Sequence, residues 1–301
     1  MTEAKQMRLL IIDGHAFAYR AFFAIRGLSS PSGQPTNAIY GFIKMFEKLE
    51  ANFLPSHTVV VWDGGLDEDR VEGLVDYKAQ RDPMPNDMEV QLDEIVTYLE
   101  ANGIASICDD GIEADDRIGQ LAKRAEEQGY DVAIASSDKD FFQLINERVK
   151  MLNPADKSGE PMDADAVEAK TGVRPHQIVD WLSLVGDAAD NIPGVPGIGV
   201  KTAASLLNEF GSVDGIYERL AEVKREKQRE ALAASKKDVR RNQELVALKL
   251  DLPGEPQLDS LRKGFEDSAQ LRKLYNKWGF EKMNKSLKRH QDQVYLEQNL
   301  L

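Results

Sequence analysis

Nine acidic side chains of this 301-residue sequence are of a type that binds divalent metal ions, and most stand where an apolar run ends or a helix is expected to begin. They are Asp13, Asp63, Glu113, Asp115, Asp116, Asp138, Asp140, Asp187 and Asp190. Carboxylates gathered in one place repel each other, so the pKa of one should rise sharply unless cations are present. Hard oxygen ligands favour Mg²⁺ or Mn²⁺, and pairs of such ions serve phosphoryl chemistry. The set therefore predicts a metal centre.

Apolar runs alternate with helical patterns in the first half of the chain. The runs are Met7–Ile12, Thr58–Trp62, Ile104–Cys108, Asp131–Ala135 and Val149–Leu152, and the helical stretches are Asn37–Asn52, Asp87–Asn102, Ala114–Gln128 and Lys139–Asn146. This alternation predicts an α/β fold with a mainly parallel central sheet flanked by helices. In such sheets ligands bind beyond the carboxyl ends of the strands, where Asp13, Asp63 and Asp138 fall. One aspartate after a strand is usually a turn former or a helix cap, but the whole set favours one site.

Two segments interrupt the alternation. The connection Gly64–Pro85 is long for a link between a strand and a helix, and long connections are often functional. From Gly172 onward strand patterns stop and the chain reads as helices. The sequence thus predicts an α/β domain over residues 1–172 and a helical domain over residues 173–301.

A dense glycine and proline motif, GDAADNIPGVPGIGVKTA, covers Gly186–Ala203. It predicts a tight turn before a helix that begins near Val200. A phosphate-binding P-loop is disfavoured, because Val200 intervenes before Lys201 and no strand leads into the motif. A helix-hairpin-helix turn fits better than a plain pair of helices, since small residues let a nucleic-acid phosphate approach helix N-terminal amides. The expected contacts are Gly194, Gly197, Gly199, Lys201 and Thr202.

The net charge of −13 argues at first against a nucleic-acid partner. The basic residues are unevenly spread, however, with ten cations against five acids between Arg219 and Lys249. The N-terminus has mixed charge and leads into a strand, so no signal peptide is expected, and no apolar run approaches the ~20 residues of a membrane span. The single cysteine, Cys108, fits a reducing compartment and is expected to be buried in a strand. These features predict a cytoplasmic protein with no membrane partner.

Six motifs together resemble the 5′ nuclease (flap endonuclease) superfamily, specifically the bacterial 5′→3′ exonuclease of the type that forms the N-terminal domain of DNA polymerase I. They are IIDGHAFAYRAFFA, VVWDGG, YKAQR, IEADDRIGQLA, SSDKDFFQLI and GDAADNIPGVPGIGVKTAASLL. The resemblance runs from about Arg8 to about Pro253. It implies a helical arch at about residues 64–87 and two catalytic metal ions.

The resemblance also implies roles for single residues. Asp13, Asp63, Glu113 and Asp115 would lie nearest the first ion, and Asp116, Asp138, Asp140, Asp187 and Asp190 around the second, directly or through water. Arg20, Lys78 and Arg81 would stand near the cleaved phosphate, Tyr77 would stack on a flap base, and Arg70 would contact DNA. Gly194–Thr202 would bind the duplex, with K⁺ at the turn.

The implied activity is Mg²⁺- or Mn²⁺-dependent hydrolysis of DNA phosphodiesters to a 5′-phosphate and a 3′-hydroxyl, at 5′ ends, nicks and flaps, in replication and repair. A monomer that works beside a DNA polymerase is expected. A non-catalytic DNA-binding protein on the same fold and an RNA-directed nuclease are the alternatives. The arch departs from the family pattern in having Asp69-Arg70 where an aromatic residue often precedes the arginine, and the acidic stretch Gly65–Asp69 should weaken phosphate attraction there.

Overall fold

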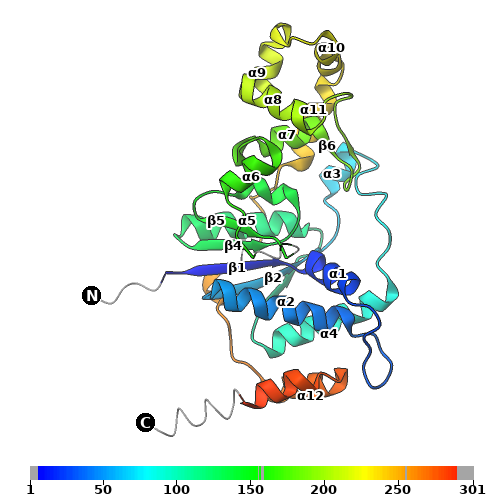
Figure 1. Cartoon of the computed structure of the whole chain (residues 1–301), viewed down its shortest axis with the longest axis vertical. Coiled ribbons are helices and arrows are strands. Elements are labelled where there is room, and N and C mark those ends of the chain that lie inside the picture. The colour runs from blue at the N-terminus through cyan, green and yellow to red at the C-terminus, as the bar shows by residue number, and fades with distance from the viewer. Residues whose placement is uncertain (1–5, 155, 157–158, 255, 290–301) are drawn as a thin grey trace, which may run out of the picture. The chain divides into compact units, whose positions relative to one another are not determined.

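The computed structural model describes residues 6–154, 156, 159–254 and 256–289 (Figure 1). The remaining residues, which include the end of the tail from Lys282 to Leu301 for which the sequence shows no motif, lie outside the described part. Contacts divide the chain into two compact units that alternate along the sequence. The first unit contains residues 62–83 and 108–256, and the second contains residues 8–61, 84–107 and the described residues from 257 onward.

In the second unit, three strands form the centre. They are β1 (Arg8–Asp13), β2 (His57–Trp62) and β3 (Ala105–Cys108), in the order β3-β2-β1. β1 and β2 are parallel, with Leu9 opposite His57 and Asp13 opposite Val61. The residues of β2 are all buried, as expected for a strand that is covered on both faces. The helices are α1 (Gly14–Ala24), α2 (Asn37–Phe53), α4 (Asn86–Ala101) and α12 (Ser268–Trp278), and α2 packs on both α1 and α4. The short 3-10 helix η4 (Leu258–Leu261) also belongs here.

The first unit has its own parallel strand pair, β4 (Asp131–Ala135) and β5 (Val149–Leu152), with Val132 opposite Val149. Helix α5 (Ala114–Glu127) packs against β4 through a buried apolar face. The 3-10 helix η1 (Lys139–Leu144) follows β4 and packs on α5. The segment that was expected to form an arch contains one short helix, α3 (Glu68–Gly73), followed by turns.

The rest of the first unit is almost entirely helical (Figure 1). Its elements are α6 (Ala164–Thr171), η2 (Pro175–Gln177), α7 (Ile178–Val185), α8 (Val200–Phe210), α9 (Val213–Glu218), η3 (Leu220–Glu222), α10 (Glu226–Ala234) and α11 (Lys236–Val246). Between α7 and α8, the two-residue strands β6 (Gly186–Asp187) and β7 (Ile192–Pro193) pair in antiparallel fashion. Among the described residues, no helix is long and apolar enough to cross a membrane.

The predicted α/β class is confirmed, because the five expected strands are present and the pairs β1–β2 and β4–β5 are both parallel. The stretch Lys139–Asn146 is helical as expected, as a 3-10 helix that ends at Leu144, and the Asp138 carboxylate accepts the Asp140 N–H of its first turn at 2.9 Å. Two details of the prediction are wrong. Strands do not stop at Gly172, since β6 and β7 follow it. Cys108 is exposed, because it is the last residue of β3.

Candidate active site

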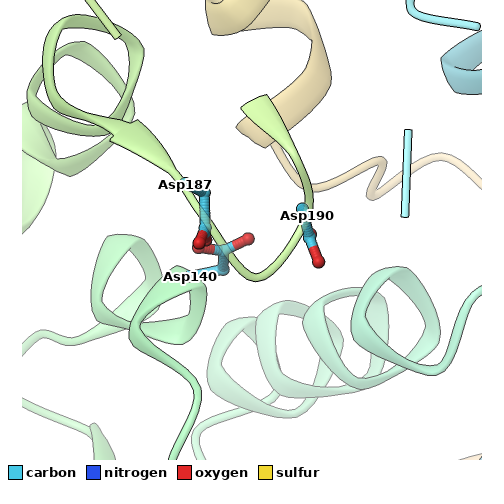
Figure 2. Close-up of side chains that lie close together, drawn as sticks. All are labelled: Asp140, Asp187 and Asp190. Carbon is cyan, nitrogen blue, oxygen red and sulfur yellow. The ribbon is translucent and has the colours of Figure 1, made fainter. Parts of the chain in front are cut away.

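Three buried carboxylates of the first unit converge on one point (Figure 2). Asp140 comes from the first turn of η1, Asp187 ends β6, and Asp190 lies in the turn between β6 and β7. Each offers an oxygen, and the three oxygens lie within 4.8 Å of one another. The antiparallel pairing of β6 with β7 closes this turn, with Asp187 in β6 and Asp190 on the arm that leads to β7.

Asp140 is the member of this cluster whose charge is least compensated by hydrogen bonds. The buried Oδ1 of Asp140 has no hydrogen-bond partner among the described residues. Burial, followed by repulsion from Asp138, Asp187 and Asp190, holds the pKa of Asp140 well above its ordinary value. Burial also raises the pKa of Asp138, against the opposing hydrogen bond from the Asp140 N–H. A buried carboxylate oxygen without a hydrogen-bond partner, close to two further carboxylates, suits a hard divalent cation.

Cations reach this cluster from two directions. Lys139 lies 3.0 Å from Asp187, and Arg81 lies 2.7 Å from Asp190. The Nζ atom of Lys78 is 3.9 Å from Asp190. These contacts neutralise the outer carboxylates, while Asp140 makes no such ion pair among the described residues. Lys139 is a neighbour that was not expected from the sequence, although its place between Asp138 and Asp140 is a signal that could have suggested it.

Glu113 is the centre of a second group of charged residues. It is the N-cap residue of α5, and its Oε2 atom accepts hydrogen bonds from the Lys78 ammonium and, at 3.2 Å, from the Tyr77 hydroxyl. Burial alone would raise the pKa of Glu113, but Lys78 and then Arg70 hold it below its ordinary value. The pKa of Lys78 is raised, because the attraction of Glu113, Asp190 and Asp115 outweighs the opposing effect of burial. Glu113 and Lys78 are therefore both charged.

The backbone at Lys78 is strained. Its φ angle is +54°, in the left-handed region that costs a residue with a side chain about 1–2 kcal/mol. The Lys78 N–H donates to the Asp190 carbonyl at 3.1 Å, which holds this conformation in place. Strained residues of this kind cluster at functional sites.

Asp116, predicted as a ligand of the second ion, is bound by protein groups. Both terminal nitrogens of Arg70 donate to its carboxylate, at 2.7 and 2.8 Å, and the Lys249 N–H donates at 2.9 Å. Arg70, predicted as a DNA contact, is only 4% exposed. Lys249 was not anticipated, since it is far along the chain and belongs to no recognisable motif.

The remaining predicted residues are distributed over both units. Asp63 and Asp115 lie in the first unit, and Asp115 lies in the first turn of α5, where its charge contributes to the raised pKa of Lys78. Asp13 and Arg20 lie in the second unit. Asp13 caps α1, accepting the Ala16 N–H at 3.1 Å. The assembly of all nine acids around two ions stays a prediction.

The glycine and proline motif forms the expected turn, and α8 begins at Val200 as predicted. Gly186 has φ +80°, and a Cβ atom on Gly194 would meet the Val185 carbonyl oxygen at 2.1 Å, so both positions require glycine. The buried side chain of Asn242 donates to the carbonyls of Ser183 and Pro193, at 3.1 and 2.7 Å, and so fastens both arms of the turn.

The end of the turn faces solvent. Gly197, Gly199 and Lys201 are exposed at the N-terminus of α8, and the half-buried Thr202 lies beside them. Exposed amides at a helix N-terminus suit a phosphate. The duplex-binding role of these residues and of Gly194 stays a prediction.

Comparisons with known proteins identify the family of this chain. A profile of the 5′-3′ exonuclease N-terminal resolvase-like domain matches residues 8–172, and a profile of the 5′-3′ exonuclease C-terminal SAM fold matches residues 173–269. The 5′-3′ exonuclease of Aquifex aeolicus (strain VF5) is 39% identical over 287 residues, which cover 95% of this chain and 96% of that protein.

DNA polymerase I of Bacillus caldotenax is 39% identical over 278 residues, which cover 91% of this chain and 32% of the polymerase, so the chain spans about a third of the length of such relatives. Among solved structures, the bacteriophage T5 D15 flap endonuclease in a pseudo-enzyme-product complex with DNA and metal ions is similar, with a TM-score of 0.67 and 25% identity. The likeness covers 80% of this chain and 89% of that one. The motifs, the fold and the profile matches together show that the chain belongs to the 5′-3′ exonuclease family.

Proposed function

We propose that this protein is a metal-dependent 5′→3′ exonuclease and structure-specific 5′-flap endonuclease, which hydrolyses DNA phosphodiesters to a 5′-phosphate and a 3′-hydroxyl. The observation that carries the proposal is the buried cluster of Asp140, Asp187 and Asp190, with cations of the arch segment directly beside it. Family membership and the likeness to a flap endonuclease bound to DNA and metal ions support the same conclusion.

The cluster would hold one of two Mg²⁺ or Mn²⁺ ions, with Asp138 and, through water, Asp116 beside it. Asp13, Asp63, Glu113 and Asp115 would hold the other. When bound, the ions supply a water of lowered pKa and stabilise charge on the reacting phosphate. The residues of the chain would fix the ions and exclude bulk water by their burial, and Arg20, Lys78 and Arg81 would provide positive charge near the phosphate.

Substrate shape would be recognised at two places in the chain. The exposed turn Gly194–Thr202 would hold duplex backbone, with K⁺ as a bridging ion, and Tyr77 would stack on a base of the 5′ strand. Tyr77 is now buried against Glu113, so stacking requires this hydrogen bond to open. We further propose a monomer that acts in the cytoplasm, on 5′ ends, nicks and flaps in replication and repair, beside a DNA polymerase.

A cleavage assay on a labelled 5′-flap DNA tests the proposal, with Mg²⁺ and with EDTA. The variant is Asp138→Asn, because asparagine can still cap η1 while it removes one charge. The matched control is Asp93→Asn, which changes an exposed acid of α4. Cleavage in Mg²⁺ that is lost in EDTA and in Asp138→Asn, but kept in Asp93→Asn, is expected. Full cleavage by Asp138→Asn would contradict the assignment, and faster cleavage of a matched RNA flap would contradict the DNA preference.

A further inference from the structure

We propose that Arg70 is a positioning residue, which fixes the first turn of α5 and with it Glu113 by means of a buried ion pair with Asp116. The consequence for catalysis rests on the proposed nuclease function. The proposal replaces direct DNA contact by Arg70 with a role inside the protein. Asp116 is then the anchor of α5, and its carboxylate accepts three hydrogen bonds from protein donors.

The Arg70–Asp116 pair has the geometry of a strong, directional contact. The two terminal nitrogens of Arg70 donate in parallel to the two carboxylate oxygens, at 2.7 and 2.8 Å. Such forked pairs fix orientation as well as distance. One of these nitrogens also donates to the Ala247 carbonyl at 3.0 Å, and the other lies 3.3 Å from Oε2 of Glu113. Arg70 is 4% exposed and Asp116 is 1% exposed, so water competes little for these bonds.

The neighbouring contacts hold the pair in place from both sides. The Lys249 N–H donates to Oδ1 of Asp116 at 2.9 Å, and the Lys249 ammonium lies 2.7 Å from both Asp67 and Asp69. The Asp67 N–H in turn donates to Oε1 of Glu113 at 3.2 Å. The acidic residues at the start of α3, which should weaken phosphate attraction, thus serve as partners for Lys249.

A phosphate contact by Arg70 would require this arrangement to break. Withdrawing the guanidinium leaves Asp116 buried without its main partner and removes a cation from Glu113, and an uncompensated buried charge is strongly unfavourable. Arg70 is only 4% exposed, so its guanidinium group faces other protein groups and not solvent. The same contacts can hold Glu113 at the start of α5 while the Arg70–Asp116 ion pair stays intact.

The conservative variant Arg70→Lys tests the role, because lysine keeps the charge and loses the fork. The matched control is Arg174→Lys, an exposed arginine paired with Asp165 and Glu168. Three quantities are measured: Mn²⁺ binding by calorimetry without DNA, kcat and KM on a 5′-flap substrate, and flap-DNA affinity in EDTA over a range of salt concentrations. We expect Arg70→Lys to lower Mn²⁺ affinity and kcat about 10–100-fold, as loss of a supporting contact does. KM, DNA affinity and its salt dependence should stay within about twofold of the wild type, and the control should be unchanged throughout.

Two results would overturn the proposal. One is unchanged Mn²⁺ affinity and kcat in Arg70→Lys. The other is weaker DNA binding with a salt slope lower by about one, which marks a lost phosphate contact. The variant Asp116→Asn gives a second test should Arg70→Lys fail to fold, since asparagine keeps the size of the side chain. Asp116→Asn should lose as much Mn²⁺ affinity and kcat as Arg70→Lys does. The double variant should lose no more than either single variant, because the two side chains act as a unit.

The same experiments separate this proposal from the proposed function. A wild-type protein that binds Mn²⁺ but cleaves no flap would refute the nuclease assignment. The Mn²⁺ affinities of the two variants would still decide whether the pair positions Glu113. If Asp116→Asn lost Mn²⁺ affinity while Arg70→Lys kept it, Asp116 would be a direct ligand and Arg70 would have no positioning role.

Discussion

Removing one charge from the buried acidic cluster should stabilise the metal-free protein and abolish most of its stabilisation by metal. Asp140 is the most informative position, because its Oδ1 atom is buried without a hydrogen-bond partner among the described residues. Asparagine has nearly the same shape, and its amide can donate to Asp187 or Asp190. The substitution Asp140→Asn therefore removes repulsion without removing a structural contact.

The size of the effect follows from the separation of the oxygens. At 4.8 Å, the outer limit within the cluster, two negative charges repel by about 3.5 kcal/mol at an effective dielectric constant near 20. Partial protonation and the cations on Asp187 and Asp190 offset much of this. We expect a net gain of about 1–2 kcal/mol for Asp140→Asn in EDTA, or roughly 2–6 °C in Tm.

The order of stability should reverse when metal is added. A ligand at 100 times its Kd stabilises the native state by about 2.7 kcal/mol. The wild type should gain about this amount from Mg²⁺, and Asp140→Asn should gain less than about a third of it. Calorimetric melting in EDTA and over a Mg²⁺ series measures both effects, with Asp93→Asn as the control that should follow the wild type. A destabilised Asp140→Asn protein in EDTA, or one with the full gain from Mg²⁺, would refute the reasoning.

The pH dependence follows from the raised pKa of Asp140 in the folded state. A folded state that binds the proton more tightly than the unfolded state is most stable below the ordinary pKa of 3.8, and it loses that stability as pH rises through the folded pKa. In EDTA, the advantage of Asp140→Asn should thus grow as pH rises from about 4. Metal must displace the same proton, so wild-type Mg²⁺ affinity should increase over the same range. If the stability of Asp140→Asn relative to the wild type fell as pH rose, the pKa of Asp140 would not be raised in the folded state.

Three further changes test other parts of the site. Lys78→Ala should destabilise the protein by about 3–5 kcal/mol in urea unfolding, because it leaves Glu113 buried beside fewer cations, and a loss below 1 kcal/mol would contradict the buried ion pair. Gly194→Ala should weaken duplex DNA binding at least tenfold in a filter-binding assay, because its Cβ would meet the Val185 carbonyl, and unchanged affinity would exclude the turn from the interface. Asn242→Leu should cost about 1–3 kcal/mol in thermal unfolding, since two backbone carbonyls of the turn lose their buried donor, and a neutral result would show that water replaces it.

The strands and the starts of helices could be predicted because their signals are local. A buried parallel strand reads as a continuous apolar run, and Asp13 and Asp138 mark the ends of two such runs and cap the helices that follow. Gly186 and Gly194 could be recognised as a tight turn because only glycine fits there. In each case the structure at a residue depends on neighbours only a few positions away in the sequence.

The partners of the arch residues could not be predicted, because they depend on tertiary contacts. Arg70 and Lys249 reach Asp116 from positions 46 and 133 residues away, and no local pattern specifies such a meeting. The family resemblance assigned Arg70 to DNA from its residue type, and the burial of its side chain could not be read from the sequence. The prediction that Cys108 is buried was wrong, because the apolar run around it does not show that the strand ends there, exposed to solvent.

The arch segment is hydrogen-bonded to the β6–β7 turn, which carries Asp190 and precedes the turn Gly194–Thr202 that is expected to hold duplex DNA. The Lys78 N–H donates to the Asp190 carbonyl at 3.1 Å, the Gln80 amide donates to the Ala188 carbonyl at 2.5 Å, and the Asn191 amide donates to the Asp76 carbonyl at 2.9 Å. These three bonds cross between residues 76–80 and 188–191, and Asp187 and Asp190 border or lie within the second of these segments. A displacement of the duplex-binding turn that moves the β6–β7 turn with it would therefore also move Lys78 and the carboxylates. Under the proposed function, the position of the duplex and the positions of the metal ligands then depend on the same hydrogen-bonded segments. DNA that is bound in the wrong place would leave the metal ligands displaced, and it would not be cleaved.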